Sequence, residues 1–361
     1  KFWTKDIEVG TIDSFKVEDI KGFATTYSTQ LIRYAVITGN WNSAIWATTS
    51  SGLPGSAAVP DSMNDVMINS GITVTVNTNG LKCNSVYFSN ETSKLSFSSS
   101  GVLNVYGNFN LASATHTAFT AWSNGAKLKF VGNAQQTINN LSTSTTATTQ
   151  TTFMEVQVEK SGDTLKIPKG DVKFNLGTSL EIIKGVFFID STSDIQGRNI
   201  DGSGATTPTI TIQPNGIFSM AGGASHIGSG TTGTPRPAIG KVTILGTIIL
   251  ATTSTNKINF GNVDVESGGT LNIPSGQSSE KINPGTVTVK SGATFITSSI
   301  TDYWALGTTF DLKLGGFYKT TASATVFPPN FINNGTVRYQ RTASGDQTIT
   351  DMNYYRLEIS N

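Results

Sequence analysis

Three aspartates and one arginine form the densest group of side chains that could do chemistry in this sequence of 361 residues. Asp190, Asp194 and Asp201 would offer hard oxygen ligands to Ca²⁺, and Arg198 could neutralise a sugar carboxylate or a developing anion. This set would suit a polysaccharide lyase or a glycoside hydrolase acting on an acidic polysaccharide. The competing interpretation is a corner loop, where turn geometry selects Asp and Gly. We favour the corner loop, because a fold does not imply the activity for which it is best known.

The other groups with catalytic potential are isolated. His116 and His226 lie 110 residues apart (226 − 116) without a partner motif beside either, so we interpret both as loop histidines without a task. Gly-x-Ser-x-Gly, His-Glu-x-x-His and P-loop motifs do not occur in the sequence. The single cysteine, Cys83, excludes an intrachain disulfide, and we interpret it as a buried small hydrophobe. We therefore expect no cofactor, with Ca²⁺ at the aspartate group as the one alternative.

Tryptophans and threonines offer surface chemistry instead. The five tryptophans could stack on sugar rings; they are Trp3, Trp41, Trp46, Trp122 and Trp304. We expect Trp41 and Trp46 to pack as a cap over the first turn of the fold, because an open sheet edge has to be covered. Threonine pairs that could rank on an ice-binding face are Thr73/Thr75, Thr209/Thr211 and Thr286/Thr288. Their irregular spacing favours the simpler account that outward strand positions prefer Thr.

Composition and charge exclude several classes of protein. The 25 basic and 24 acidic residues leave a net charge of +1, and basic clusters are absent, so nucleic acid is not an expected partner. With 37% hydrophobic and 14% charged residues, the chain does not have the composition of a disordered protein. No apolar run approaches the roughly 20 residues that span a bilayer. Residues 1–6 do not form a signal peptide, so any export signal has been removed or lies upstream.

Short alternating segments predict β-strands along most of the chain. From about Asp65 onward, apolar residues at every second position are bounded by Gly, Asn or Ser-Gly; Ile72, Val74 and Val76 are one example. The segment 12–23 has a weak one-sided apolar pattern, and a short capping helix and a strand remain open for it.

A phrase recurs at a regular interval. Val263-x-Val265 leads through Ser-Gly-Gly-Thr to Leu271, and Val287-x-Val289 leads through Ser-Gly-Ala-Thr to Phe295, 24 residues later (287 − 263). A related phrase starts at Ile210, 53 residues before Val263 (263 − 210), about twice that interval. This predicts an all-β, elongated, right-handed parallel β-helix (a β-solenoid) in which each repeat is one coil. About ten coils between residues 64 and 300 would make a rod on the order of 50 Å long. A pair of β-sandwiches is the alternative, but it does not explain a regular interval.

A longer repeat divides the chain. Residues 124–130 precede Gln136-Thr137-Ile138, and the related residues 334–339 precede Gln347-Thr348-Ile349, 211 residues later (347 − 136). The second copy stops where the first one continues, so we expect the sequence to be a fragment of a larger protein. The predicted domains are an N-terminal cap or extension at 1–38, a parallel β-helix at 39–330, and the truncated start of a further repeat unit at 331–361.

The sequence contains an ordered series of motifs: Gly39-Asn40-Trp41-Asn42-Ser43, Trp46, Pro60, Asp65-Val66-Met67-Ile68 and Gly71-Ile72-Thr73-Val74-Thr75-Val76. This series resembles the opening module of very large surface proteins of Bacteroidota. The resemblance covers residues 34–190, recurs at 330–361, and fits 191–330 only in general style. It implies a parallel β-helix, export through the type IX secretion system, and presentation as an adhesin or surface filament. Residues 1–33 match nothing in that pattern. The sorting domain expected at the natural C-terminus does not occur within these 361 residues, so the type IX route rests on the resemblance alone.

The resemblance also implies O-glycosylation at Asp-Ser/Thr steps, with Ser62, Thr164 and Ser191 as the candidates. The sequence thus predicts a non-catalytic extracellular segment at the cell surface, serving for display and for binding. The expected partners are a glycan or cell surface and further copies or subunits of a filament. Nucleic acid and a membrane span are not expected.

Overall fold

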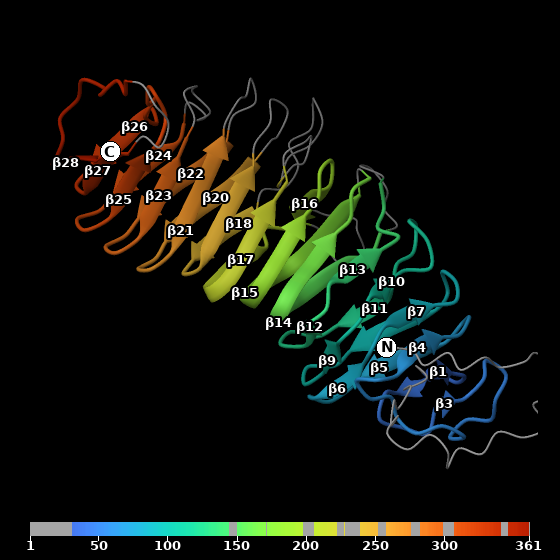
Figure 1. Cartoon of the computed structure of the whole chain (residues 1–361). Coiled ribbons are helices and arrows are strands. Elements are labelled where there is room, and N and C mark those ends of the chain that lie inside the picture. The colour runs from blue at the N-terminus through green and yellow to red at the C-terminus, as the bar shows by residue number, and fades with distance from the viewer. Residues whose placement is uncertain are drawn as a thin grey trace, which may run out of the picture.

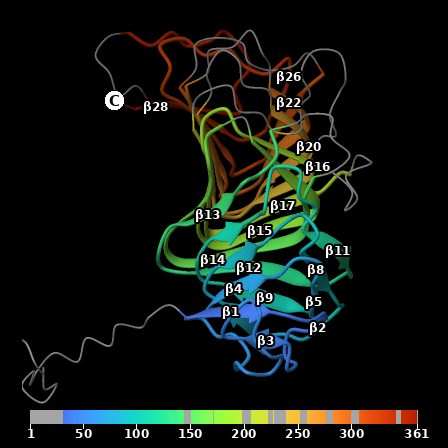
Figure 2. The same ribbon diagram turned by 90° about the vertical axis from the view of Figure 1, so that its right-hand side faces the viewer.

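The chain folds as an all-β structure with a mostly parallel sheet. The computed structural model describes residues 31–143, 150–170, 172–197, 206–221, 227, 239–251, 258–275, 282–298, 307–340 and 346–360. These residues form strands β1 to β28 and include no helix. The described part of the chain therefore contains no helix that could cross a membrane. Figures 1 and 2 show the strands following one another along one direction from the β1 region to β28. The chain is therefore an elongated stack.

Most strands pair in parallel with the equivalent strand one coil before and one coil after, and the pairs form three ladders. The first ladder begins with β1 (Ile32–Ala35), β4 (Asp65–Ile68), β7 (Val86–Phe88), β10 (Phe109–Asn110) and β13 (Gln136–Asn139). It passes through the C-terminal parts of the long strands β14 (Thr152–Ile167), β15 (Lys173–Ile189) and β17 (Thr209–Met220). It ends with β19 (Thr247–Ala251), β21 (Thr270–Ser275), β23 (Thr294–Thr297), β25 (Phe317–Thr320), β27 (Thr336–Gln340) and β28 (Arg356–Ser360).

The second ladder consists of shorter strands. It contains β2 (Gly39–Asn40), β5 (Thr73–Val76), β8 (Lys94–Phe97) and β11 (Phe119–Trp122). The N-terminal parts of β14 and β15 pair with each other in the same parallel sense, and β15 then pairs with β16 (Asp194–Gly197).

The third ladder runs through most of the described chain. It contains β6 (Leu81–Cys83), β9 (Val102–Val105), β12 (Lys127–Gly132), and the middle parts of β14, β15 and β17. It continues with β18 (Ile239–Ile244), β20 (Ile258–Val265), β22 (Ile282–Val289), β24 (Thr309–Leu312) and β26 (Asn330–Asn333).

The registers confirm the predicted repeat interval. Val263 pairs directly with Val287, the residue 24 positions later. Val242 pairs with Ile210 in the preceding strand and with Val263 in the following strand. The interval of 53 residues between Ile210 and Val263 therefore spans two coils. One coil of the chain thus returns each strand to the neighbouring position of the same ladder.

Alternation along each strand builds one continuous core. Every second residue of strands such as β5 and β9 is buried and the residues between are half-exposed. In parallel strands that lie about 4.8 Å apart, this alternation places inward residues of successive coils above one another. Phe153 stacks on Phe174 with ring centroids 5.1 Å apart, and Phe187 and Phe218 continue the series at 5.6 and 5.7 Å. The core is an aliphatic and aromatic column along the stack.

Glycines in a left-handed conformation turn the chain from the third ladder to the first. Gly268 and Gly292 have φ values of +82° and +75°, a region in which an L side chain is strained. The amide of Gly268 donates to the carbonyl of Gly292 at 3.0 Å, and the amide of Gly292 donates to the carbonyl of Gly315 at 2.8 Å. The recurrent Ser-Gly step of the sequence therefore forms a stacked corner.

The N-terminal end of the stack is covered, as predicted for the two tryptophans. β3 (Trp46–Ala47) pairs antiparallel with β1 and breaks the parallel ladder there. Trp41 and Trp46 are fully buried, their ring centroids lie 5.1 Å apart, and Trp46 Nε1 donates to the carbonyl of Trp41 at 2.6 Å. This arrangement occupies the edge that a further parallel strand would use.

The ladders cross both predicted domain boundaries. β1 precedes residue 39 and pairs with β4, and β26, β27 and β28 continue the third and first ladders beyond residue 330. The division into domains at residues 39 and 331 stays a prediction. The segment 12–23, for which a helix and a strand were open, lies outside the described residues.

Candidate functional site

The predicted aspartate group is held by lysines where the structure describes it. Asp190 directly follows β15, lies 2.8 Å from Lys166 Nζ, and accepts a hydrogen bond from the Ser191 amide at 2.7 Å. Partial burial opposes ionisation, but the hydrogen bonds from Lys166 and Ser191 hold the pKa of Asp190 below its usual range. Arg198 and Asp201 lie outside the described residues.

Asp194 forms a buried ion pair on the second ladder. Its carboxylate lies 2.5 Å from Lys173 Nζ, and both side chains are almost completely buried. β15 and β16 place the two residues directly opposite each other in register. Asp190 and Asp194 are thus engaged by different lysines, and the described part of the chain contains no group of three or more metal-ligating side chains.

His116 is part of the core rather than a free loop side chain. It lies in the loop between β10 and β11, as predicted, but its ring is fully buried against Phe88 with centroids 4.7 Å apart. Nε2 lies 2.8 Å from the Ser93 carbonyl, which can only accept, and Nδ1 accepts from the Ala112 amide at 3.4 Å. Burial lowers the pKa of His116, so the neutral ring joins two successive coils. His226 lies outside the described residues.

Cys83 and Trp122 have structural positions. Cys83 is fully buried in β6, and burial raises the pKa of its thiol well above the usual value, which confirms the prediction of a small buried hydrophobe. Trp122 stacks on Phe97 with centroids 4.1 Å apart, and its Nε1 donates to the carbonyl of Ala126 at 2.9 Å. Trp3 and Trp304 lie outside the described residues.

The candidate glycosylation residues occupy half-buried positions. Ser62 lies in the loop before β4, Thr164 lies within β14 opposite Val186, and Ser191 lies in the turn after β15. All three residues are partly exposed to solvent.

The threonine pairs do not form an uninterrupted row in the third ladder. Thr211 lies opposite Thr243, but the next positions of that row are Asp264, Thr288 and Asp311. The alternation of Thr with Asp agrees with the simpler account of these residues as outward strand positions.

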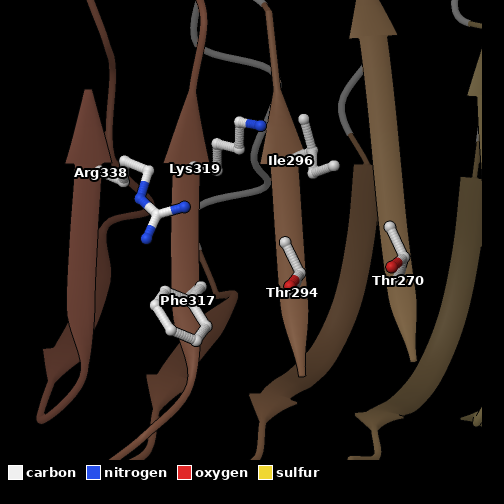
Figure 3. A pocket seen from close by; sticks show the side chains of 6 residues that line it. All are labelled: Thr270, Thr294, Ile296, Phe317, Lys319 and Arg338. Atoms are coloured by element: carbon white, nitrogen blue, oxygen red, sulfur yellow. The ribbon is translucent and has the colours of Figure 1, made fainter. Parts of the chain in front are cut away.

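A shallow groove lies on the outer face of the first ladder. It has a volume of about 280 Å³ and crosses β21, β23, β25 and β27 (Figure 3). Its lining residues come in two rows, Thr270, Thr294 and Phe317 in one and Ile296, Lys319 and Arg338 in the other. Each row takes one residue from each successive strand, so the parallel register alone assembles the groove.

The charges at this groove are arranged asymmetrically. Arg338 donates from Nε to Glu358 at 2.7 Å, and its Nη2 lies 2.6 Å from the same carboxylate oxygen. The guanidinium lies over the Phe317 ring at 5.2 Å from the centroid, a cation–π distance. Lys319 is half-buried and lies between Ile296 and Arg338 in the same row. It makes no ion pair or hydrogen bond with any residue that the structure describes.

Sequence reasoning did not find this groove. Its residues occupy outward positions of four consecutive repeats, and Phe317-x-Lys319 followed by Thr336-x-Arg338 was the available signal. Those positions become neighbours only when the register of β25 with β27 is known. No family model, curated protein or solved structure matches this chain, so the role of the groove rests on its own chemistry.

Proposed function

We propose that the chain is a segment of a right-handed parallel β-solenoid that acts as a non-catalytic display and adhesion scaffold on the outside of a bacterial cell. The observation that carries this proposal is the third ladder, whose parallel register runs from β6 to β26. A stack that keeps one register over this length makes a stiff element with outward side chains at a constant spacing. Such a surface can meet another surface at several coils at once.

The functional partner in this proposal is a glycan or a cell surface. Outward rows rich in Thr, Asn and charged residues offer hydroxyls and amides for hydrogen bonds to sugar hydroxyls. Several weak contacts along one rigid face add up through effective concentration. The resemblance of residues 34–190 to Bacteroidota surface proteins supports the same assignment and, with it, export by the type IX route.

Adhesion and turnover together test the proposal. Beads that carry the chain in one orientation are passed over glycan-coated surfaces and over bacterial and host cells, and the retained fraction is compared with beads carrying heat-unfolded chain. In parallel, acidic polysaccharides are incubated with the protein with and without Ca²⁺, and unsaturated or reducing products are measured. We expect retention without product formation. Turnover of a polysaccharide, or retention no greater than that of the unfolded chain on all surfaces, would overturn the assignment.

A further inference from the structure

Lys319 differs from the paired lysines on the outside of the stack. Five lysines form ion pairs with carboxylates from neighbouring positions: Lys129 with Glu159, Lys166 with Asp190, Lys241 with Asp264, Lys290 with Glu266, and Lys313 with Asp311. Lys319 has no such partner among the described residues, although it is half-buried in the groove. A half-buried ammonium gains more from an anionic ligand than a fully hydrated one, because less solvent screens it.

A second cation of the groove is held in place before any ligand arrives. Glu358 engages two nitrogens of Arg338, and Phe317 lies beneath the guanidinium. Arg356 also contacts Glu358, at 3.1 Å. The cations Lys319, Arg338 and Arg356 against the carboxylate of Glu358 leave a local charge of +2 (3 − 1), whereas the whole chain has only +1.

The uncharged lining residues Thr270, Thr294 and Phe317 suit the hydroxyl groups and the apolar ring face of a sugar. Thr270 and Thr294 precede Phe317 in one row, so two hydroxyls and one aromatic ring follow each other at the strand spacing of about 4.8 Å. A pyranose has an apolar C–H face that packs on an aromatic ring and hydroxyls that pair with Thr. Figure 3 shows the lining side chains on the same side of neighbouring strands, with the Arg338 guanidinium directed toward Phe317.

We propose that this groove binds an acidic oligosaccharide laid across β21, β23, β25 and β27. A sugar carboxylate pairs with Lys319 and Arg338, a sugar ring packs beside Phe317, and hydroxyl groups contact Thr270 and Thr294. The groove covers three strand spacings, about 14 Å, which suits a short stretch of a chain rather than a single ion. This assignment rests on the proposed adhesive function and names the class of glycan that this face of the stack recognises.

The test is calorimetric titration of the whole chain with oligogalacturonate, and with the same oligosaccharide after reduction of its carboxylates to alcohols. We expect binding of the acidic form only, weakened by added salt. Lys319→Met should raise Kd roughly tenfold or more, because one charge-assisted hydrogen bond is lost. Phe317→Ala should also weaken binding. Lys82→Met, an exposed lysine on β6 at the other end of the stack, should leave Kd unchanged and serves as the matched control.

Three results would overturn the assignment: equal binding of the reduced oligosaccharide, equal binding of a poly-glutamate peptide, or an unchanged Kd in Lys319→Met. The variant should fold, since the Lys319 side chain makes no ion pair or hydrogen bond with a described residue, and an unchanged thermal unfolding curve verifies this. If oligogalacturonate fails to bind while beads of the chain still adhere, the groove assignment fails and the scaffold function stands. If the beads do not adhere either, the proposed function fails as well.

Discussion

Both copies of the Gln-Thr-Ile unit pair an apolar strand with the strand that follows it, in the third ladder for the first copy and in the first ladder for the second, but the paired residues differ in burial. In the first copy, Leu128 and Phe130 of β12 pair with Val156 and Val158 of β14. In the second copy, Val337 and Tyr339 of β27 pair with Leu357 and Ile359 of β28. Val158 is 0% exposed, whereas Ile359 at the equivalent position is 64% exposed.

The neighbouring coil explains the difference. β15 follows β14 in the ladder and places Ile182 directly over Val158, while no described strand follows β28. The same apolar pattern therefore becomes core only where a further coil covers it. In this stack, whether an apolar residue is buried depends on whether a neighbouring repeat covers it.

The glutamine of each unit makes the same pair of hydrogen bonds. Gln136 Nε2 donates to the carbonyls of Val105 and Gly107 at 2.8 and 2.6 Å. Gln347 Nε2 donates to the carbonyls of Thr320 and Ala322 at 3.4 and 2.7 Å. The recurring glutamine thus joins its coil to the previous one, at carbonyls two residues apart.

The largest difference between the copies is expected for a charge placed in the covered position. Val158→Asp buries a carboxylate without a partner and should lower the free energy of unfolding by about 4 kcal/mol or more. Ile359→Asp, at the exposed position, should change it by about 0.5 kcal/mol or less. Urea unfolding followed by circular dichroism measures both. Equal losses in the two variants would contradict the role assigned to the covering coil.

A smaller difference is expected for the two glutamines. Gln136→Leu removes the side-chain donor from the buried Val105 carbonyl and the part-buried Gly107 carbonyl. It also removes one of the two acceptors of Lys160 Nζ, which lies 2.7 Å from Gln136 Oε1 and 2.7 Å from the Ala134 carbonyl. The cost should be about 2–4 kcal/mol, whereas the half-exposed Gln347→Leu should cost about 1 kcal/mol because water replaces the lost bonds. The unfolding midpoints of the two single variants give the comparison, and a midpoint for Gln347→Leu as low as that for Gln136→Leu would refute it.

A pH-dependent difference concerns a lysine that only the first copy has among the described residues. Burial lowers the pKa of Lys160 from its ordinary value of 10.5 to about 8, although Asp163 acts in the opposite direction. Between these two values the unfolded chain binds more protons than the folded chain, so this lysine makes stability rise with pH in that window. Below pH 8 both states are protonated and its contribution is constant.

Lys160→Met provides the reference for this prediction. The difference in unfolding free energy between the native chain and Lys160→Met should grow in favour of the native chain from pH 8 to pH 10 and stay level from pH 6 to pH 7.5. Chemical unfolding at each pH measures it. A difference that stays constant up to pH 10 would mean that Lys160 titrates at its ordinary value.

Sequence reasoning predicted the parts of the fold that follow from local pattern. The period-2 alternation identified the inward residues, and the interval from Val263 to Val287 identified one coil. Coil lengths vary, however, from 19 residues between Phe317 and Thr336 (336 − 317) to 35 between Gly39 and Val74 (74 − 39). The loops absorb this variation, so a fixed interval could not give the register of every strand.

The buried polar residues and the groove could not be predicted, because both depend on the strand register that the sequence interval does not give. Lys160 and the Lys173–Asp194 pair occupy buried positions that a hydrophobic pattern does not predict, because each relies on a partner 21 to 24 residues away. Lys319 and Arg338 likewise become neighbours of Phe317 only through the pairing of β25 with β27. The residue types are evident from the sequence, but their roles depend on which residues of adjacent coils are paired.

The most direct test of the stacked register is a disulfide between adjacent coils. Thr286 and Thr309 are paired residues of neighbouring strands, whereas Thr286 and Asn330 are two coils apart in the same row. Paired Cα atoms of parallel strands lie about 4.8 Å apart, within disulfide range, and two coils span about 9.6 Å, beyond it. Mild oxidation should therefore close an intrachain disulfide in T286C/T309C and leave T286C/N330C with free thiols, as counted by mass after alkylation. Closure in the second variant and not in the first would contradict the stack on which the scaffold and its groove depend.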